Sequence, residues 1–259
     1  MKSEKVIVKI GKKNVAEITL NRPENLNTFN SILAEQLYDA LLKLDADKNV
    51  RVVLLSGAGK SFCAGIDVNE LSNKTALEYR EWIERMERPL LAISKMKKPV
   101  IVQLQGVAAA NGMGLVAAAD LAIAEENARM GLTAINVGLN CVGPVIPVAR
   151  CLGRKKALEL LFYGNLISAT DALTLGLINK VVPTDELETE ARRWAEELAQ
   201  KSPIAVQIAK SAFYHAEDME YEKQFAHMNE AFARLCTTDD AKEGVQAFFD
   251  KRKPVWKEK

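Results

Sequence analysis

Short apolar runs and helical repeats alternate along the first part of the chain and predict its elements. Each apolar run is typical of a buried strand, and the runs lie at 6–10, 15–20, 50–56, 99–105, 121–126 and 177–182. Four leucines recur at helical spacing and predict an amphipathic helix over 31–46, namely Leu33, Leu37, Leu41 and Leu44.

Further helices are predicted between these strands and after them. They cover 75–96, a segment that starts near Asn111, and the segments 153–164 and 168–176. From Thr184 onward the pattern is helical almost to the end. Strands that alternate with helices, followed by helices alone, indicate an α/β core with a helical C-terminal portion. We place the core at 1–200 and the helical region at 201–259.

Composition and charge exclude several classes of function. The chain has 259 residues, of which 48% are apolar, and its 35 basic and 34 acidic residues leave a net charge of +1. This balance does not predict a nucleic-acid partner. No apolar run approaches the roughly 18 residues of a membrane span. The first residues read as a strand, and the four cysteines show no CxxC spacing, so we predict reduced thiols and a cytoplasmic location.

Two weaker signals of chemistry are present. Gly59-Lys60-Ser61 matches the end of a phosphate-binding loop, but the position that needs its first glycine holds Leu54. We therefore interpret Lys60 as a loop lysine and keep a nucleotide-binding enzyme as a weakened alternative. His215 and His227, the chain's two histidines, lie in a charged helical region without metal-ligand spacing, and no metal site is predicted.

Two loops of small residues follow separate strands and precede helix starts. They read "SFCAGID" at 61–67 and "GVAAANGMG" at 106–114. Small side chains let a ligand approach the backbone, and helix N-termini carry free N–H groups. If the loops are adjacent, two N–H groups can converge on one oxygen as an oxyanion hole. Close packing of helix on strand explains the same residues, and both interpretations stay open.

The order of motifs resembles the crotonase, or enoyl-CoA hydratase/isomerase, superfamily. The motifs are "NRPE-LN", "SFCAGID", "PVIVQLQGVAAANGMGLVAAADLAIA", "GRKKALELLFYG", "ISATDALTLGLINKVV" and "FFDKRKPVW". The resemblance implies a spiral of β-β-α units, and C-terminal helices used in a homotrimer or a dimer of trimers. It implies an acyl-CoA thioester as substrate or ligand, with no metal or redox cofactor.

The resemblance also assigns candidate residues. Ile66 and Asn111 match the two backbone donors of the family's oxyanion hole. Residues expected near the CoA body are Asn25, Leu26, Ala64, Gly65, Asp67 and Val68. Lys253 and Trp256 match a C-terminal segment that reaches the CoA of a neighbouring subunit in related enzymes.

Both glutamates of the family's hydratases are missing. Their positions hold Gly114 and Ala134, as in an orphan subgroup named enoyl-CoA hydratase domain-containing proteins. Polar candidates that remain are Asp67, Asn136, Asn140 and Cys141. Two hypotheses follow. The first is an enzyme that stabilises a thioester enolate, as a hydratase, an isomerase or a relative, with inefficient hydration expected. The second is an acyl-CoA-binding protein with little or no catalysis. Gly114→Glu together with Ala134→Glu is expected to raise hydration.

Overall fold

The computed structural model describes residues 4–71 and 73–259. Its strands are β1 (Val6–Ile10), β2 (Val15–Leu20), β3 (Val52–Gly57), β4 (Val100–Leu104), β5 (Val107–Ala109), β6 (Leu121–Glu125), β7 (Arg129–Gly131), β8 (Ile167–Ser168) and β9 (Lys180–Val182). Its α-helices are α1 (Ser31–Ala46), α2 (Ala76–Lys95), α3 (Asn111–Ala118), α4 (Val145–Tyr163), α5 (Ala169–Thr174), α6 (Leu187–Ala199), α7 (Pro203–Ala216), α8 (Tyr221–Thr237) and α9 (Asp239–Phe249).

A repeated unit explains how the strands form two sheets. The larger sheet has the order β1-β2-β3-β4-β6-β9, and its pairs are parallel except β1 with β2. In the smaller sheet, β5 pairs in parallel with β7, and β7 pairs antiparallel with β8. The chain thus runs from β4 to β5 to α3 and then from β6 to β7 to α4, so successive β-β-α units stack beside one another. This arrangement confirms the predicted fold class.

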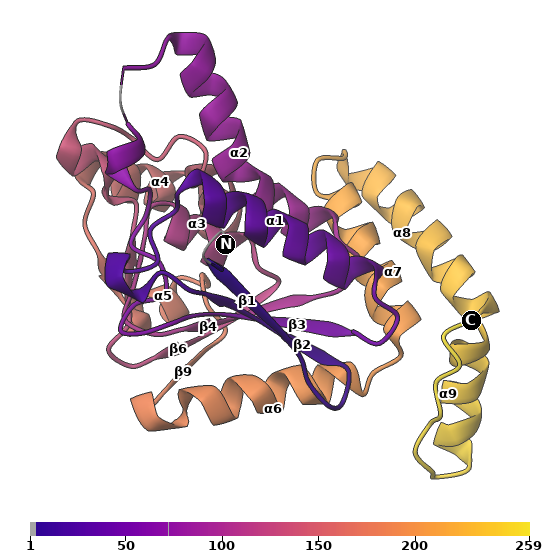
Figure 1. Ribbon diagram of the computed structural model, residues 1–259. Coiled ribbons are helices and arrows are strands. Elements are labelled where there is room, and N and C mark those ends of the chain that lie inside the picture. The colour runs from indigo at the N-terminus through magenta and orange to yellow at the C-terminus, as the bar shows by residue number, and fades with distance from the viewer. Residues whose placement is uncertain (1–3, 72) are drawn as a thin grey trace.

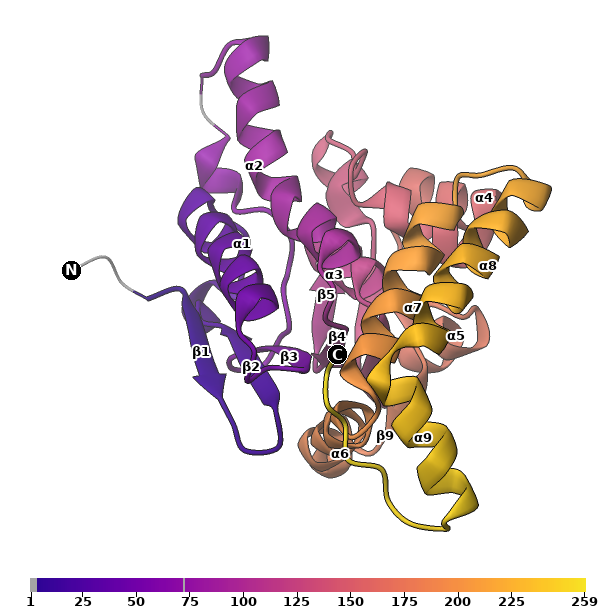
Figure 2. The same cartoon turned by 90° about the vertical axis from the view of Figure 1, so that its right-hand side faces the viewer.

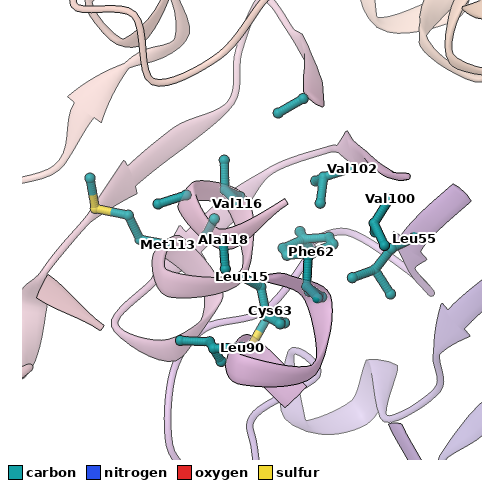
Figure 3. Packing of buried hydrophobic residues seen from close by; sticks show 14 of the residues in the cluster. Leu55, Phe62, Cys63, Leu90, Val100, Val102, Met113, Leu115, Val116 and Ala118 are labelled. Carbon is teal, nitrogen blue, oxygen red and sulfur yellow. The ribbon is translucent and has the colours of Figure 1, made fainter. Parts of the chain in front are cut away.

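The larger sheet is covered on both faces, which accounts for its continuous apolar strands. Val53 and Leu55 face the main core, which includes residues of α1, α2 and α3, whereas Val52 and Leu54 pack with α6. Figure 1 shows α6 below the sheet and α1 above it. Close by, Phe62 and Cys63 of the loop after β3 lie among the side chains of α3, and Leu90 of α2 lies beside them (Figure 3).

The C-terminal helices are joined to the core through buried charges. Nζ of Lys210 on α7 lies 2.7 Å from Oδ2 of Asp120, which precedes β6, and donates to the carbonyl of Lys98 at 2.9 Å. Beyond α7, helices α8 and α9 extend along one side of the molecule (Figure 2). They expose large aromatic side chains, namely Tyr221, Phe225, Phe232, Phe248 and Phe249. The predicted boundary at residue 200 falls between α6 and α7.

Most predicted elements are confirmed, and the differences are short or irregular segments. The helix predicted over 153–164 starts earlier, at Val145, and is interrupted by Gly153, whose φ of 73° is not helical. Strands β5, β7 and β8 have two or three residues each and were not predicted. Within 4–71 and 73–259, no helix is both long and apolar enough to cross a membrane.

Candidate functional site

The two small-residue loops lie side by side and are joined by backbone hydrogen bonds. The amide of Cys63 donates to the carbonyl of Val107 at 3.1 Å, and the amide of Ala109 donates to the carbonyl of Cys63 at 2.9 Å. Cys63 and Ala108 therefore form a parallel bridge. Ile66 and Asn111 each lie three residues beyond a bridged residue, so the register carries both candidate donors to the same place.

The two candidate donor residues line the same cavity, and their backbone N–H groups have no acceptor in the described part of the chain. Ile66 and Asn111 line a cavity of about 210 Å³. Neither backbone N–H donates a hydrogen bond to any residue in the described part of the chain. Both donors are therefore available to an oxygen of a bound ligand. Such a pair is suited to an oxygen that gains negative charge.

Unusual backbone angles at the preceding residues orient the backbone N–H groups of Ile66 and Asn111. Ala110, immediately before Asn111, has φ 48° and ψ −113°, and Gly65, immediately before Ile66, has φ 105°. Such angles cost an alanine on the order of 1–3 kcal/mol and persist where the surrounding structure enforces them. The two turns also touch, because a Cβ atom on Gly65 would lie 3.1 Å from Cβ of Ala110.

The side chain of Asn111 is a feature that the sequence interpretation did not use. Asn111 is fully buried, and neither Oδ1 nor Nδ2 has a hydrogen-bond partner among the described residues. An unpaired buried carboxamide costs about 1–3 kcal/mol. The start of α3 therefore combines a free backbone donor with a free side-chain donor and acceptor. The only signal in the sequence is an Asn inside a run of small residues.

Gly112 lets α3 approach the other loop. A Cβ atom at this position would overlap the carbonyl group of Cys63, which is held by its hydrogen bond to Ala109. We expect Gly112→Ala to lower the free energy of unfolding by about 1–3 kcal/mol. Urea denaturation measures this change.

Gly244→Ala is the matched control for Gly112→Ala, because Gly244 also lies in a helix but its added Cβ would only touch the Trp256 ring at 3.4 Å. It is expected to stabilise α9 by about 0.5–1 kcal/mol. Equal effects of the two substitutions would show that the approach of α3 to Cys63 is not tight.

Apart from the two C-terminal residues, eight of the thirteen residues that the sequence predicted for this site line the cavity. Those that line it are Ala64, Gly65, Ile66, Val68, Asn111, Ala134, Asn140 and Cys141. Those that lie outside it are Asn25, Leu26, Asp67, Gly114 and Asn136. Residues that the prediction missed include Ile83 of α2 and the segment Val142–Pro144, which close another part of the wall.

Three of the outlying residues support the cavity loop instead. The carbonyl of Leu26 accepts the amide of Ala64 at 3.0 Å. Arg22 donates to Oδ2 of Asp67 at 2.8 Å and to Oδ1 of Asn25 at 3.3 Å. Burial would raise the pKa of Asp67, but its hydrogen bonds with Arg22 and Asn69 lower it overall. Asp67 is thus a paired carboxylate that holds the turn after Ile66.

The polar candidates after β7 have other roles or limited reactivity. Asn136 is exposed and donates to the carbonyl of Gly164 at 3.1 Å. Oδ1 of Asn140 accepts the amide of Cys141 at 2.8 Å. Burial raises the pKa of the Cys141 thiol, which keeps it protonated and disfavours it as a nucleophile.

The two positions of the missing glutamates differ in their surroundings. Ala134 lines the cavity, whereas Gly114 is buried against other residues. A Cβ atom on Gly114 would lie 2.9 Å from Cδ2 of Leu90 and 3.0 Å from Cβ of Pro144. A glutamate cannot enter there unless both residues move. The expectation that Gly114→Glu together with Ala134→Glu raises hydration stays a prediction, and it requires Leu90 and Pro144 to shift.

The loop after β3 does not have the form of a phosphate-binding loop. No helix begins at Lys60 or Ser61 within the described chain, and the next helical turn is at Val68–Glu70. Nδ2 of Asn27 donates to the carbonyls of Ala58 and Ser61, both at 2.8 Å, and fixes the loop. Lys60 is exposed, as predicted for a loop lysine.

The C-terminal segment packs on its own chain. Nε1 of Trp256 donates to the carbonyl of Gln200 at 2.7 Å, and Oδ1 of Asp240 accepts the amides of Lys257 and Glu258. Lys253 is exposed. Contact of Lys253 or Trp256 with the ligand of a neighbouring subunit stays a prediction.

The stacked β-β-α units define a crotonase-type fold, and comparison with known proteins gives the family. Residues 11–259 match the enoyl-CoA hydratase/isomerase family, and the chain belongs to it. It is 34% identical over 243 residues to enoyl-CoA hydratase domain-containing protein 3, mitochondrial, of Xenopus laevis, covering 93% of this chain and 83% of that protein.

Solved structures of similar proteins superpose closely on the chain. An enoyl-CoA hydratase of Mycobacterium smegmatis has a TM-score of 0.94 at 36% identity, with 97% of this chain and 98% of that one covered. The human enoyl-CoA hydratase domain-containing protein 3 has a TM-score of 0.93 at 32% identity, with 97% and 100% covered. The subgroup predicted from the sequence is thereby confirmed.

Proposed function

We propose that the chain binds an acyl-CoA thioester with its carbonyl oxygen between the amides of Ile66 and Asn111. The observation that carries the proposal is the pair of free backbone donors on one cavity wall. They would stabilise the enolate formed when a proton leaves Cα. A volume of about 210 Å³ suits the acyl end of the ligand and not the whole of CoA.

A second candidate function is acyl-CoA binding with little or no hydration. It is favoured by the residues at the two glutamate positions, since neither Gly114 nor Ala134 can transfer a proton, and by the packing of Leu90 and Pro144 over Gly114. Hydration of an enoyl-CoA needs one group to accept a proton from water and another to deliver a proton at Cα.

Turnover of crotonyl-CoA tests both candidates. Each missing carboxylate is worth about 10²- to 10⁴-fold, so we expect hydration far below that of a two-glutamate hydratase. In the same samples butyryl-CoA should raise the melting temperature, because a ligand that binds the folded state stabilises it, whereas ATP should not. A shift with ATP alone would contradict the proposal and favour a nucleotide site. Hydration near the diffusion limit would contradict the expected loss.

The oligomeric state and the cellular location of the protein are also proposed. The exposed aromatic side chains of α8 and α9 support a homotrimer or a dimer of trimers, because large exposed apolar patches mark interfaces. The cytoplasmic location stays a prediction, and the name of the Xenopus laevis relative includes the word mitochondrial. No cofactor is proposed beyond the CoA thioester itself.

A further inference from the structure

Glu87 is an acidic residue on the side of α2 that faces the cavity. It lies four residues after Ile83 and three before Leu90, and this spacing places the three side chains on one stripe of the helix. Ile83 lines the cavity, and Leu90 is 7% exposed and covers Gly114. A carboxylate in such a stripe is unusual unless it is paired or has a function.

The carboxylate of Glu87 packs directly on Gly143. A Cβ atom on Gly143 would overlap both Oε1 and Cδ of Glu87, so the absence of a side chain at residue 143 makes room for the carboxylate. Gly143 itself lines the cavity, between Val142 and Pro144. The carboxylate of Glu87 therefore lies against a residue of the cavity wall.

Glu87 has no partner for its charge. It forms no hydrogen bond and no ion pair with any residue of 4–71 or 73–259, whereas Glu84, one turn earlier, pairs with Arg80 at 3.0 Å. Burial, and then the negative charge of Glu84, raises the pKa of the Glu87 carboxyl. A carboxyl whose pKa moves toward neutral is better suited to general acid–base catalysis.

Glu87 also lies near the space that the side chain of a glutamate at residue 114 would occupy. The space over Gly114 is filled by Leu90 and Pro144. Leu90 follows Glu87 by one turn of α2, and Pro144 follows Gly143 directly. Gly114 thus packs against Leu90 and Pro144, and Glu87 packs against Gly143, the residue before Pro144.

We propose that Glu87 is the carboxylate that transfers the proton at Cα of the bound acyl group, an inference that rests on the proposed function. In this step the Cα–H bond breaks and the proton bonds to the Glu87 carboxylate. The electron pair moves into the bond between Cα and the carbonyl carbon, and the carbonyl π pair moves onto the oxygen between Ile66 and Asn111. Return of the proton to Cα reverses the step, and its delivery to Cγ of a β,γ-unsaturated chain completes an isomerisation. No further reactant is needed.

Exchange of Cα protons of butyryl-CoA in D₂O tests this role, with mass spectrometry as the readout. We expect Glu87→Gln, which keeps the shape and removes the base, to slow exchange by about 10²-fold or more. The dissociation constant for butyryl-CoA should be unchanged. Glu81→Gln, at an exposed position on the same helix, is the matched control, and its exchange rate should equal that of the unsubstituted protein.

Three outcomes would overturn the role of Glu87 and one would overturn the proposed function beneath it. Exchange at an unchanged rate in Glu87→Gln, loss of butyryl-CoA binding by Glu87→Gln, or binding without exchange by the unsubstituted protein each contradicts the role of Glu87. Failure of the unsubstituted protein to bind butyryl-CoA contradicts the acyl-CoA site itself.

Discussion

Replacing the Ile66 amide by an ester is expected to slow Cα proton exchange of bound butyryl-CoA by about 100- to 1,000-fold. The change, made by incorporating the α-hydroxy analogue of isoleucine, removes one N–H and leaves every side chain in place. That N–H donates to no described residue, so the folded chain loses no hydrogen bond of its own at this atom. Butyryl-CoA affinity should fall less, by about tenfold, because a neutral carbonyl gains less from the donor than an enolate does.

An ester at Val142 is the matched control. Val142 lines the same cavity, and its own N–H also makes no hydrogen bond to the described residues. An ester also makes the preceding carbonyl a weaker acceptor, and both variants have this side effect. The ester at Ile66 weakens the bond from Phe29 to the carbonyl of Gly65, and the ester at Val142 weakens the bond from Val145 to the carbonyl of Cys141. Equal slowing by the two esters would contradict a specific role for the Ile66 donor.

Lys210→Met is expected to lower the free energy of unfolding by about 3–5 kcal/mol, as is usual when one partner of a buried ion pair is removed. The Lys210 and Asp120 side chains are 6% and 15% exposed. Without the ammonium group, the Asp120 carboxylate keeps only the neutral donors of Val100 and Tyr214, and the carbonyl of Lys98 loses its bond from Lys210. Urea denaturation of the full chain measures the loss.

A second substitution separates charge from packing at this pair. Asp120→Asn in the Lys210→Met background removes the unpaired charge but keeps an oxygen for the amide of Val100, so part of the stability should return. Lys242→Met, at a 69% exposed position on α9, should change stability by less than about 0.5 kcal/mol. A loss below about 1 kcal/mol for Lys210→Met would show that the pair does not hold α7 to the core.

The sequence predicts elements whose boundaries are set by local residues. The helix over 31–46 is reproduced because Asn30 caps it, accepting the amide of Leu33 at 2.9 Å, and because its leucine stripe is buried. The two loops were predicted as a possible joint site from their small residues. Their adjacency depends on a bridge between Cys63 and Ala108, which are 45 residues apart, and no local pattern encodes it.

The rest of the site depends on contacts between distant segments. Leu90 and Pro144 fill the space over Gly114, although they lie on either side of it in sequence. Pro147 and Gly153 read as helix breakers and concealed the first turns of α4, where a proline near the start is tolerated. The carboxylate of Glu87 reads as an ordinary charge on a polar helix until the position of Gly143 is known.

The start of α3 combines a strained backbone with a carboxamide that has no hydrogen-bond partner among the described residues, and both features couple the stability of the protein to ligand binding. The backbone of Ala110 and the unpaired carboxamide of Asn111 both make the empty folded state less stable than it would otherwise be. A thioester bound at this turn favours the folded chain over the unfolded one, and cellular proteases remove chains according to the fraction unfolded. Binding of the proposed thioester would then raise the amount of folded protein that escapes degradation.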